Sequence, residues 1–97
     1  MTGDEESVAG LIARLHEELS ATAELPLEAA ANRWLGEAEA VVADLDRGDP
    51  DRETVARRVR TVRDLLEEVD GTGREEGDAR VARARELAAA VSARVDG

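Results

Sequence analysis

The single histidine of the chain is the first place to look for chemistry. His16 opens the stretch HEELS, which begins like the zinc-protease motif H-E-x-x-H. In that motif two histidines one helical turn apart bind zinc, and the glutamate acts as the general base. Ser20 stands where the second histidine would be, so this site is excluded. Ala13 precedes His16 by three residues, so the Glu-x-x-His pair of di-iron helical bundles is missing as well.

Other catalytic groups are equally scarce. The chain has no cysteine, so a thiol nucleophile, a zinc finger and a disulfide framework are all excluded. A hydrolase of the serine–histidine–acid type would have to combine His16 with Ser7, Ser20 or Ser92, and no motif places these residues together. Adjacent carboxylates are numerous, but neighbours on a helix point about 100° apart and form solvated faces. We therefore expect no catalytic residue, no metal site, no cofactor and no enzymatic activity.

A second candidate is the glycine-rich stretch VDGTGREEGDAR, residues 69–80. A phosphate-binding loop of the Walker type requires lysine, and the chain has none. An EF-hand loop counted from Asp70 would need glycine at its sixth position, where Glu75 stands. The pattern instead favours a link between two helices, and an irregular cation site within residues 70–78 stays open as an alternative.

Within this link each residue has a predicted structural role. Gly71 can adopt the left-handed conformation that ends a helix. Thr72 and Glu75 match the T-x-x-E capping box that begins the next helix. Gly77 would then lie inside the first turns, where glycine costs about 1 kcal/mol relative to alanine. Either that end of the helix frays, or the helix begins at Asp78.

The residues best suited to recognition are one tryptophan and three arginines. Trp34 is surrounded in helical spacing by alanines, which predicts either a large anchor in the core or a residue exposed to a partner, since Trp is enriched in binding hot spots. Arg52, Arg58 and Arg63 flank a stripe of valines on one predicted helix. They could meet the acidic half of the same chain or an acidic partner. We take Trp34, Arg52, Arg58 and Arg63 as the candidate interface.

Charge is abundant and unevenly distributed. The chain of 97 residues has 23 acids and 13 basic residues, for a net charge of −10, and all the basic residues are arginine. Residues 1–51 hold 13 of the acids and only three arginines, while residues 52–97 hold ten of each. Such acidity opposes binding to nucleic acids and anionic membranes, which are polyanions. It also suits molar salt, where the screening length is only about 3 Å, and the alternative is the similar bias of acidic proteins from a GC-rich mesophile.

Hydrophobic periodicity predicts helix from end to end. Apolar residues recur at helical spacing in four segments, over about residues 4–23, 26–47, 50–69 and 74–95. Thr2 with Glu5, or Asp4, is expected to cap the first, Pro26 to open the second, and Asp49 to cap the third. Short links between helices of similar length favour antiparallel neighbours. The predicted fold is an all-α, up-down-up-down four-helix bundle in a single domain over residues 1–97.

Two phrases, RWLGEAEAVVADL (residues 33–45) and VRDLLEEVDGTG (residues 62–73), stand in an acidic chain without lysine. Together they resemble a group of short haloarchaeal proteins of uncharacterised function. The resemblance implies a small helical domain in a salt-rich cytoplasm, and it carries over no catalytic residue, cofactor or partner.

The sequence therefore predicts a non-catalytic protein that associates with itself, as a dimer, or with another protein. The alternative is a helical bundle that binds a small ligand or a cation, near Trp34 or at residues 70–78. The acidic start MTGDEES differs from a secretory signal, and no run of about 20 apolar residues could span a membrane. We expect a cytoplasmic protein with neither nucleic acid nor membrane as partner.

Overall fold

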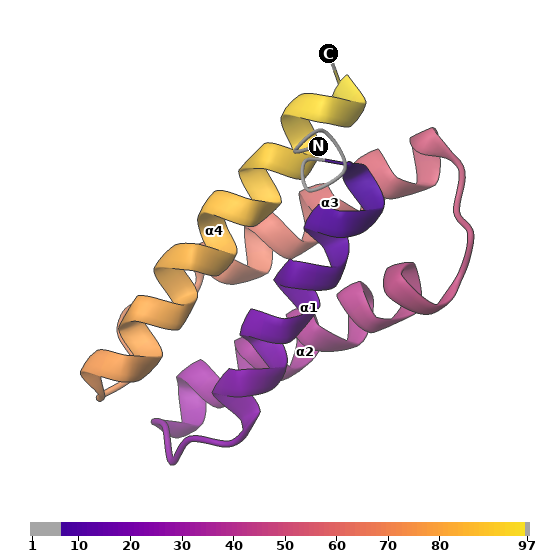
Figure 1. Cartoon of the computed structure of the whole chain (residues 1–97). Helices are drawn as coiled ribbons and strands as arrows, with labels where there is room; N and C mark the ends of the chain where they lie inside the picture. The colour runs from indigo at the N-terminus through magenta and orange to yellow at the C-terminus, as the bar shows by residue number, and fades with distance from the viewer. Residues whose placement is uncertain (1–6, 97) are drawn as a thin grey trace.

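The computed structural model describes residues 7–96, which form four α-helices and no strand. The helices are α1 (Val8–Ala23), α2 (Ala29–Arg47), α3 (Arg52–Glu67) and α4 (Glu75–Asp96). Each helix packs against two others, α1 and α3 both lying between α2 and α4, and the described residues make no diagonal contacts. Figure 1 shows the α1–α2 and α3–α4 links at one end of the bundle and the α2–α3 link at the other. The predicted all-α, up-down-up-down four-helix bundle is confirmed.

The core runs along the inner stripe of every helix and is made of aliphatic and small side chains. Large side chains with essentially no exposure are contributed by all four helices, among them Leu15, Leu19, Leu35, Val42, Val59, Leu66 and Val91. Ala38, Ala84 and Ala88 are also fully buried, and their small size lets the helix backbones approach closely. Each buried Val or Leu contributes about 1.5–3 kcal/mol, so this stripe is what holds the helices together. No helix of residues 7–96 has the length and apolarity needed to cross a membrane.

The first helix starts later than predicted. Ser7 caps α1, because its Oγ accepts a hydrogen bond of 3.0 Å from the backbone N–H of Gly10. The predicted start at Asp4, and the predicted caps Thr2 and Asp4, lie outside the described residues.

The prediction that Pro26 opens the second helix is wrong, since α2 begins at Ala29. The cause is a contact between the two links at one end of the bundle. The backbone of Glu28 is extended, and its N–H donates a hydrogen bond of 3.0 Å to the carbonyl of Thr72 in the α3–α4 link. Leu27 is buried beside this contact. The α1–α2 link therefore pairs with a distant segment before it turns into helix.

The third helix is capped by Asp51 rather than by the predicted Asp49. The Asp51 carboxylate accepts a hydrogen bond of 2.8 Å from the backbone N–H of Thr54, at the position where a helix leaves its N–H groups unpaired. Hydrogen bonds from the backbone and then the side chain of Thr54 hold the pKa of Asp51 below its ordinary value of 3.8. Asp49 and Pro50 lie in the α2–α3 link, before the helix begins.

The glycine-rich stretch is a link between helices, as predicted, but its hydrogen bonds differ. Gly71 and Gly73 both have positive φ, 109° and 88°, which glycine adopts without a side-chain clash. Thr72 is buried, and its backbone N–H and hydroxyl both lie 2.9 Å from an oxygen of Asp78. The predicted Thr72–Glu75 capping box is therefore wrong. Thr72 faces the interior, so Asp78 in the first turn of α4 reaches back to it while Glu75 remains exposed.

Gly77 has a packing role that explains its place within a helix. It is buried in the first turn of α4, which begins at Glu75 and not at Asp78. A Cβ atom at this position would lie 2.5 Å from Thr72 Oγ1 and 2.8 Å from Leu27 Cδ2. The absence of a side chain is what lets α4 approach both links this closely.

Candidate functional site

Trp34 lies partly exposed on α2 and packs against the core. The Arg33 guanidinium carbon is 5.4 Å from the centroid of the indole ring, within the range of a cation–π interaction. The position of Trp34 around the helix follows from the contacts of its neighbours. Glu39 and Asp46 of α2 bond to Ser20 and His16 of α1, which fixes the side of α2 that faces α1. By the helical period Trp34 lies on the other side of the buried stripe, toward α3.

Two further apolar side chains continue this surface. Val41 is seven residues after Trp34 and therefore on the same side of α2. Leu65 lies on the side of α3 opposite the residues that bond to α4. Both are partly exposed and pack against the core, as Trp34 does. We call the surface formed by Trp34, Val41, Arg58 and Leu65 the open face.

Arg58 belongs to the open face because it borders α2. It lines a shallow pocket together with Thr54 of α3 and with Asp44 and Leu45 of α2. Leu65 follows Arg58 by seven residues and Trp34 precedes Asp44 by ten, so Leu65 and Trp34 both lie farther from the α2–α3 link than this pocket does.

Arg52 lies on the other side of α3, where it contacts the end of α4. Its Nε and Nη2 atoms donate hydrogen bonds of 2.9 Å to the carbonyls of Val95 and Arg94. The last carbonyls of a helix have no partner within the helix and carry partial negative charge. Arg52 thus caps α4 from the first turn of α3.

Arg63 lies on the same side as Arg52. Its Nη1 atom donates a hydrogen bond of 3.2 Å to Ser92 Oγ of α4, and Ser92 donates to Asp96 at 3.0 Å. The four residues predicted as one interface therefore divide between two surfaces. Trp34 and Arg58 share the open face between α2 and α3, whereas Arg52 and Arg63 lie between α3 and α4.

Arg85 is a residue of this second surface that the sequence did not reveal. Its Nη2 atom donates hydrogen bonds of 2.8 and 2.9 Å to the carbonyls of Leu66 and Val69, at the end of α3. The one signal in the sequence is that the last turn of α3 has no basic residue of its own. Arg52 and Arg85 thus cap the helices reciprocally, one from α3 to α4 and one from α4 to α3.

An open pocket of about 360 Å³ lies on this surface, lined by Arg63, Leu66, Glu67 and Arg85. We call it the arginine groove. Among residues 7–96 neither Arg63 nor Arg85 has a carboxylate oxygen within ion-pair distance. Both guanidinium groups are held in place by uncharged oxygens, and both keep N–H donors that point to no protein acceptor.

The two halves of the chain do meet through complementary charge, at α1 and α4. Glu18 of α1 lies 3.2 Å from Arg80 and 3.3 Å from Arg83, both of α4. The Glu18 side chain is only 18% exposed, so solvent screens this pair less than the exposed pairs of the molecule. An acid of the first half of the chain thus forms ion pairs with arginines of α4, while Arg52 and Arg63 of α3 donate hydrogen bonds to uncharged oxygens.

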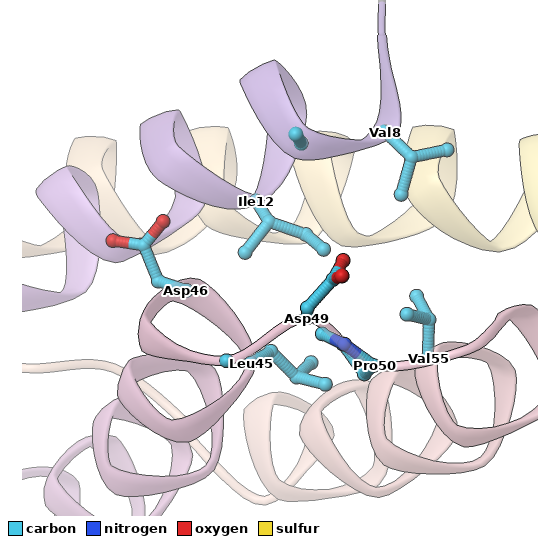
Figure 2. Close-up of a pocket in the computed structure, with 9 residues that line it drawn as sticks. Val8, Ile12, Leu45, Asp46, Asp49, Pro50 and Val55 are labelled. Carbon is cyan, nitrogen blue, oxygen red and sulfur yellow. The ribbon is translucent and has the colours of Figure 1, made fainter.

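His16 contacts Asp46, one of the residues that line the pocket shown in Figure 2. His16 Nδ1 lies 3.2 Å from Asp46 Oδ2, which links α1 to α2. Asp46 also borders a pocket of about 140 Å³ at the end of the bundle, where the side chains of Val8, Ile12, Leu45 and Val55 converge. The Asp49 carboxylate points toward Val8 and Ile12 across this pocket.

Among the described residues, no metal-binding cluster and no serine–histidine pair forms around His16. Residues 7–96 contain no group of three or more His, Asp or Glu side chains arranged to hold a metal ion. Ser20, the serine nearest to His16 in sequence, donates its hydroxyl to Glu39 instead. In the stretch 70–78, the Asp78 carboxylate already accepts hydrogen bonds from Thr72.

Comparison with protein families identifies a match over nearly the whole chain. The model of a domain of unknown function, DUF8152, matches residues 11–97. Comparisons with curated proteins and with solved structures gave no match. The match begins at Leu11 on α1 and covers every residue of the open face and of the arginine groove.

Proposed function

We propose that the chain, which belongs to the DUF8152 family of unknown function, is a non-catalytic module that binds a second copy of itself through the open face. One observation carries the proposal. Trp34, Val41 and Leu65 pack against the core yet stay partly exposed, and all three lie along the same side of the bundle. A large aromatic residue within an apolar strip is typical of a binding hot spot.

Charge favours a second copy as the partner. Glu39 and Asp46 of α2 face α1, and Arg52 and Arg63 of α3 face α4, so the charges left toward the open face are the acids Glu37 and Asp44 of α2 and Arg58 of α3. A two-fold axis parallel to the helices would place α2 of one copy against α3 of the other. Arg58 of each copy would then approach the partner's Asp44 or Glu37. The surface is therefore complementary to itself in charge as well as in its apolar strip.

The size of the open face sets the expected strength of association. With 19 residues, α2 is about 28 Å long, and two adjacent helices are about 20 Å wide. The face can thus bury about 550 Å² in each copy, or about 1,100 Å² in total. This is near the lower limit of specific interfaces, so we expect a dissociation constant in the micromolar range.

We also propose that the protein works in a salt-rich cytoplasm. The net charge of −10 without lysine, and the resemblance to short haloarchaeal proteins, support adaptation to a salt-rich cytoplasm. Salt at molar concentration would screen repulsion between two acidic copies but would leave the apolar strip effective. The acidity also opposes nucleic acid as a partner. We propose no enzymatic role.

The decisive experiment measures molar mass by light scattering across a range of protein concentrations. We expect the wild-type protein to pass from monomer to dimer in the micromolar range, at both 0.5 and 3 M KCl. Arg58→Glu should weaken dimerisation about tenfold or more at 0.5 M KCl, because it places like charges across the interface, and less at 3 M KCl. Circular dichroism of the same samples checks that each variant is folded.

Arg63→Glu is the matched control, because Arg63 is on the same helix but faces α4. It should leave the dimerisation constant within about twofold of the wild-type value. A protein that remains monomeric at about 1 mM, or equal effects of Arg58→Glu and Arg63→Glu, would overturn the proposal.

A further inference from the structure

We infer that the arginine groove between α3 and α4 binds an acidic amino acid, glutamate or aspartate. This site is separate from the open face and does not depend on dimerisation. The arginines of the groove lack acidic partners although the chain is rich in acids. Acids outnumber arginines in this chain by ten, yet Arg63 and Arg85 have no carboxylate within ion-pair distance among residues 7–96. Both line one pocket of about 360 Å³.

Both guanidinium groups are fixed before any ligand arrives. Arg85 is held by two backbone carbonyls through Nη2 alone, which leaves its Nε and Nη1 donors for another acceptor. Arg63 is held by Ser92, which is itself fixed through Asp96. Because Nη2 belongs to both two-donor edges of the Arg85 guanidinium, its Nε and Nη1 donors can each supply only a single hydrogen bond to a ligand oxygen. Arg63 is held through Nη1 alone, so its Nε–Nη2 edge can bind a carboxylate in two parallel hydrogen bonds. Because the side chains are already ordered, a ligand need not supply the free energy of ordering them.

The third charged residue of the groove narrows the ligand class. Glu67 lines the same pocket, and a carboxylate there would repel a simple dianion such as phosphate or a plain dicarboxylate. It would instead accept hydrogen bonds from an ammonium group. Two arginines and one glutamate therefore match a ligand with two carboxylates and one ammonium. That set of groups describes an acidic amino acid, and the pocket volume is in the range of small-ligand sites.

The test is a titration of the ¹⁵N-labelled protein followed by NMR at constant ionic strength. L-glutamate and L-aspartate are the ligands, and glutarate, which has two carboxylates but no ammonium, is the comparison. We expect at least one amino acid to shift the signals of Leu66, Ser92 and the arginine Nε groups, saturably and with a millimolar dissociation constant. Glutarate should bind about tenfold more weakly, because it cannot satisfy Glu67.

Variants separate binding from folding. Arg63→Gln should weaken binding of the amino acid about tenfold while melting at a similar temperature, because Arg63 anchors no helix end. Arg60→Gln, an exposed arginine of α3 that does not line the groove, is the matched control and should bind as the wild type does. Glu67→Gln should abolish the preference for the amino acid over glutarate.

Three results would overturn the inference. The first is the absence of saturable shifts up to about 50 mM of either amino acid, a limit well above the millimolar range expected for so small a ligand. The second is equal binding of glutarate and glutamate by the wild-type protein. The third is an unchanged affinity in Arg63→Gln. Because the groove is remote from the open face, a failure here leaves the dimer test unaffected, and a monomeric protein leaves this test unaffected.

Discussion

The two sides of α3 use arginine in opposite ways. Toward α4, Arg52 and Arg63 donate to oxygens of the neighbouring helix, and Arg85 returns the contact from α4 to α3. Toward α2, Arg58 lines a pocket with Thr54, Asp44 and Leu45 and makes no hydrogen bond to the described residues. On the side of α3 that faces α4, arginines thus form hydrogen bonds within the chain. On the side that faces α2, Arg58 is exposed.

This difference shows what a long cationic side chain can do in a chain without lysine. The planar guanidinium group of Arg52 or Arg85 reaches two carbonyls at once, which the single ammonium of lysine does less well. Arg52 and Arg85 therefore stabilise helix ends, and most of their effect should appear in folding. Arg58 has no such anchor, so its effect should appear in association. Substitutions can therefore separate an effect on folding from an effect on association.

The largest effect on stability is expected from Arg85→Gln. The substitution removes charged hydrogen bonds to the carbonyls of Leu66 and Val69 at the end of α3, and the Leu66 carbonyl keeps only its weaker bond of 3.2 Å from the backbone N–H of Val69. Hydrogen bonds to charged groups contribute about 1.5–3 kcal/mol, and we expect a loss of about 2 kcal/mol in the free energy of unfolding. For a chain of this size that corresponds to a fall of roughly 10 °C in melting temperature.

The measurement is thermal unfolding followed by circular dichroism, at a protein concentration at which both proteins are monomeric. Arg83→Gln is the control on the same helix, since it loses only a partly exposed ion pair with Glu18, which contributes less than about 1 kcal/mol. Equal losses in the two variants would mean that the side of α3 that faces α4 has no special contribution from helix capping.

A smaller effect is expected from Arg52→Gln, the reciprocal cap. Arg52 donates to carbonyls in the final turn of α4, where the helix ends and fraying already weakens the structure. We expect a loss of about 1 kcal/mol and faster amide hydrogen exchange confined to the last turns of α4. Exchange that rises equally in α3 and α4 would show that the contact has a global role instead.

The sequence predicted the elements of the fold better than their ends. Helical periodicity of apolar residues is local information, so the four helices and their antiparallel order could be predicted. The start of α2 could not, because it depends on the hydrogen bond between Glu28 and Thr72, residues that lie far apart in sequence. Gly77 looked unfavourable for the same reason, since its cause is the close approach of Leu27 and Thr72.

The sequence predicted on which helices the candidate interface residues lie, but not which helices they face. Helical spacing correctly placed Arg52, Arg58 and Arg63 beside the valine stripe of α3, but it could not show that α2 and α4 pack on opposite sides of that stripe. The division of Trp34 and Arg58 from Arg52 and Arg63 therefore needed the structure. Arg85 was missed because its partners, Leu66 and Val69, are backbone carbonyls of another helix, which leave no trace in residue type.

The smallest effect on stability is expected from Asp51, the residue that caps the start of α3. The hydrogen bonds from Thr54 lower the pKa of Asp51 in the folded protein, so ionised Asp51 stabilises the fold at pH values above its ordinary pKa of 3.8. That contribution is lost as the pH falls through the lowered pKa of the folded state. Asp51→Asn keeps a capping oxygen but cannot ionise.

Other carboxylates titrate in the same range, so the informative quantity is the difference in melting temperature between wild type and Asp51→Asn. We expect Asp51 to be the more stable form at pH 7, and the difference to shrink as the pH falls through the lowered pKa of Asp51, below which both side chains are uncharged. Asp49→Asn is the control, because Asp49 lies in the link and caps no helix. If Asp49→Asn showed the larger pH-dependent difference, α3 would begin where the sequence suggested, and the register that places Arg52 beside the end of α4 would have to be revised.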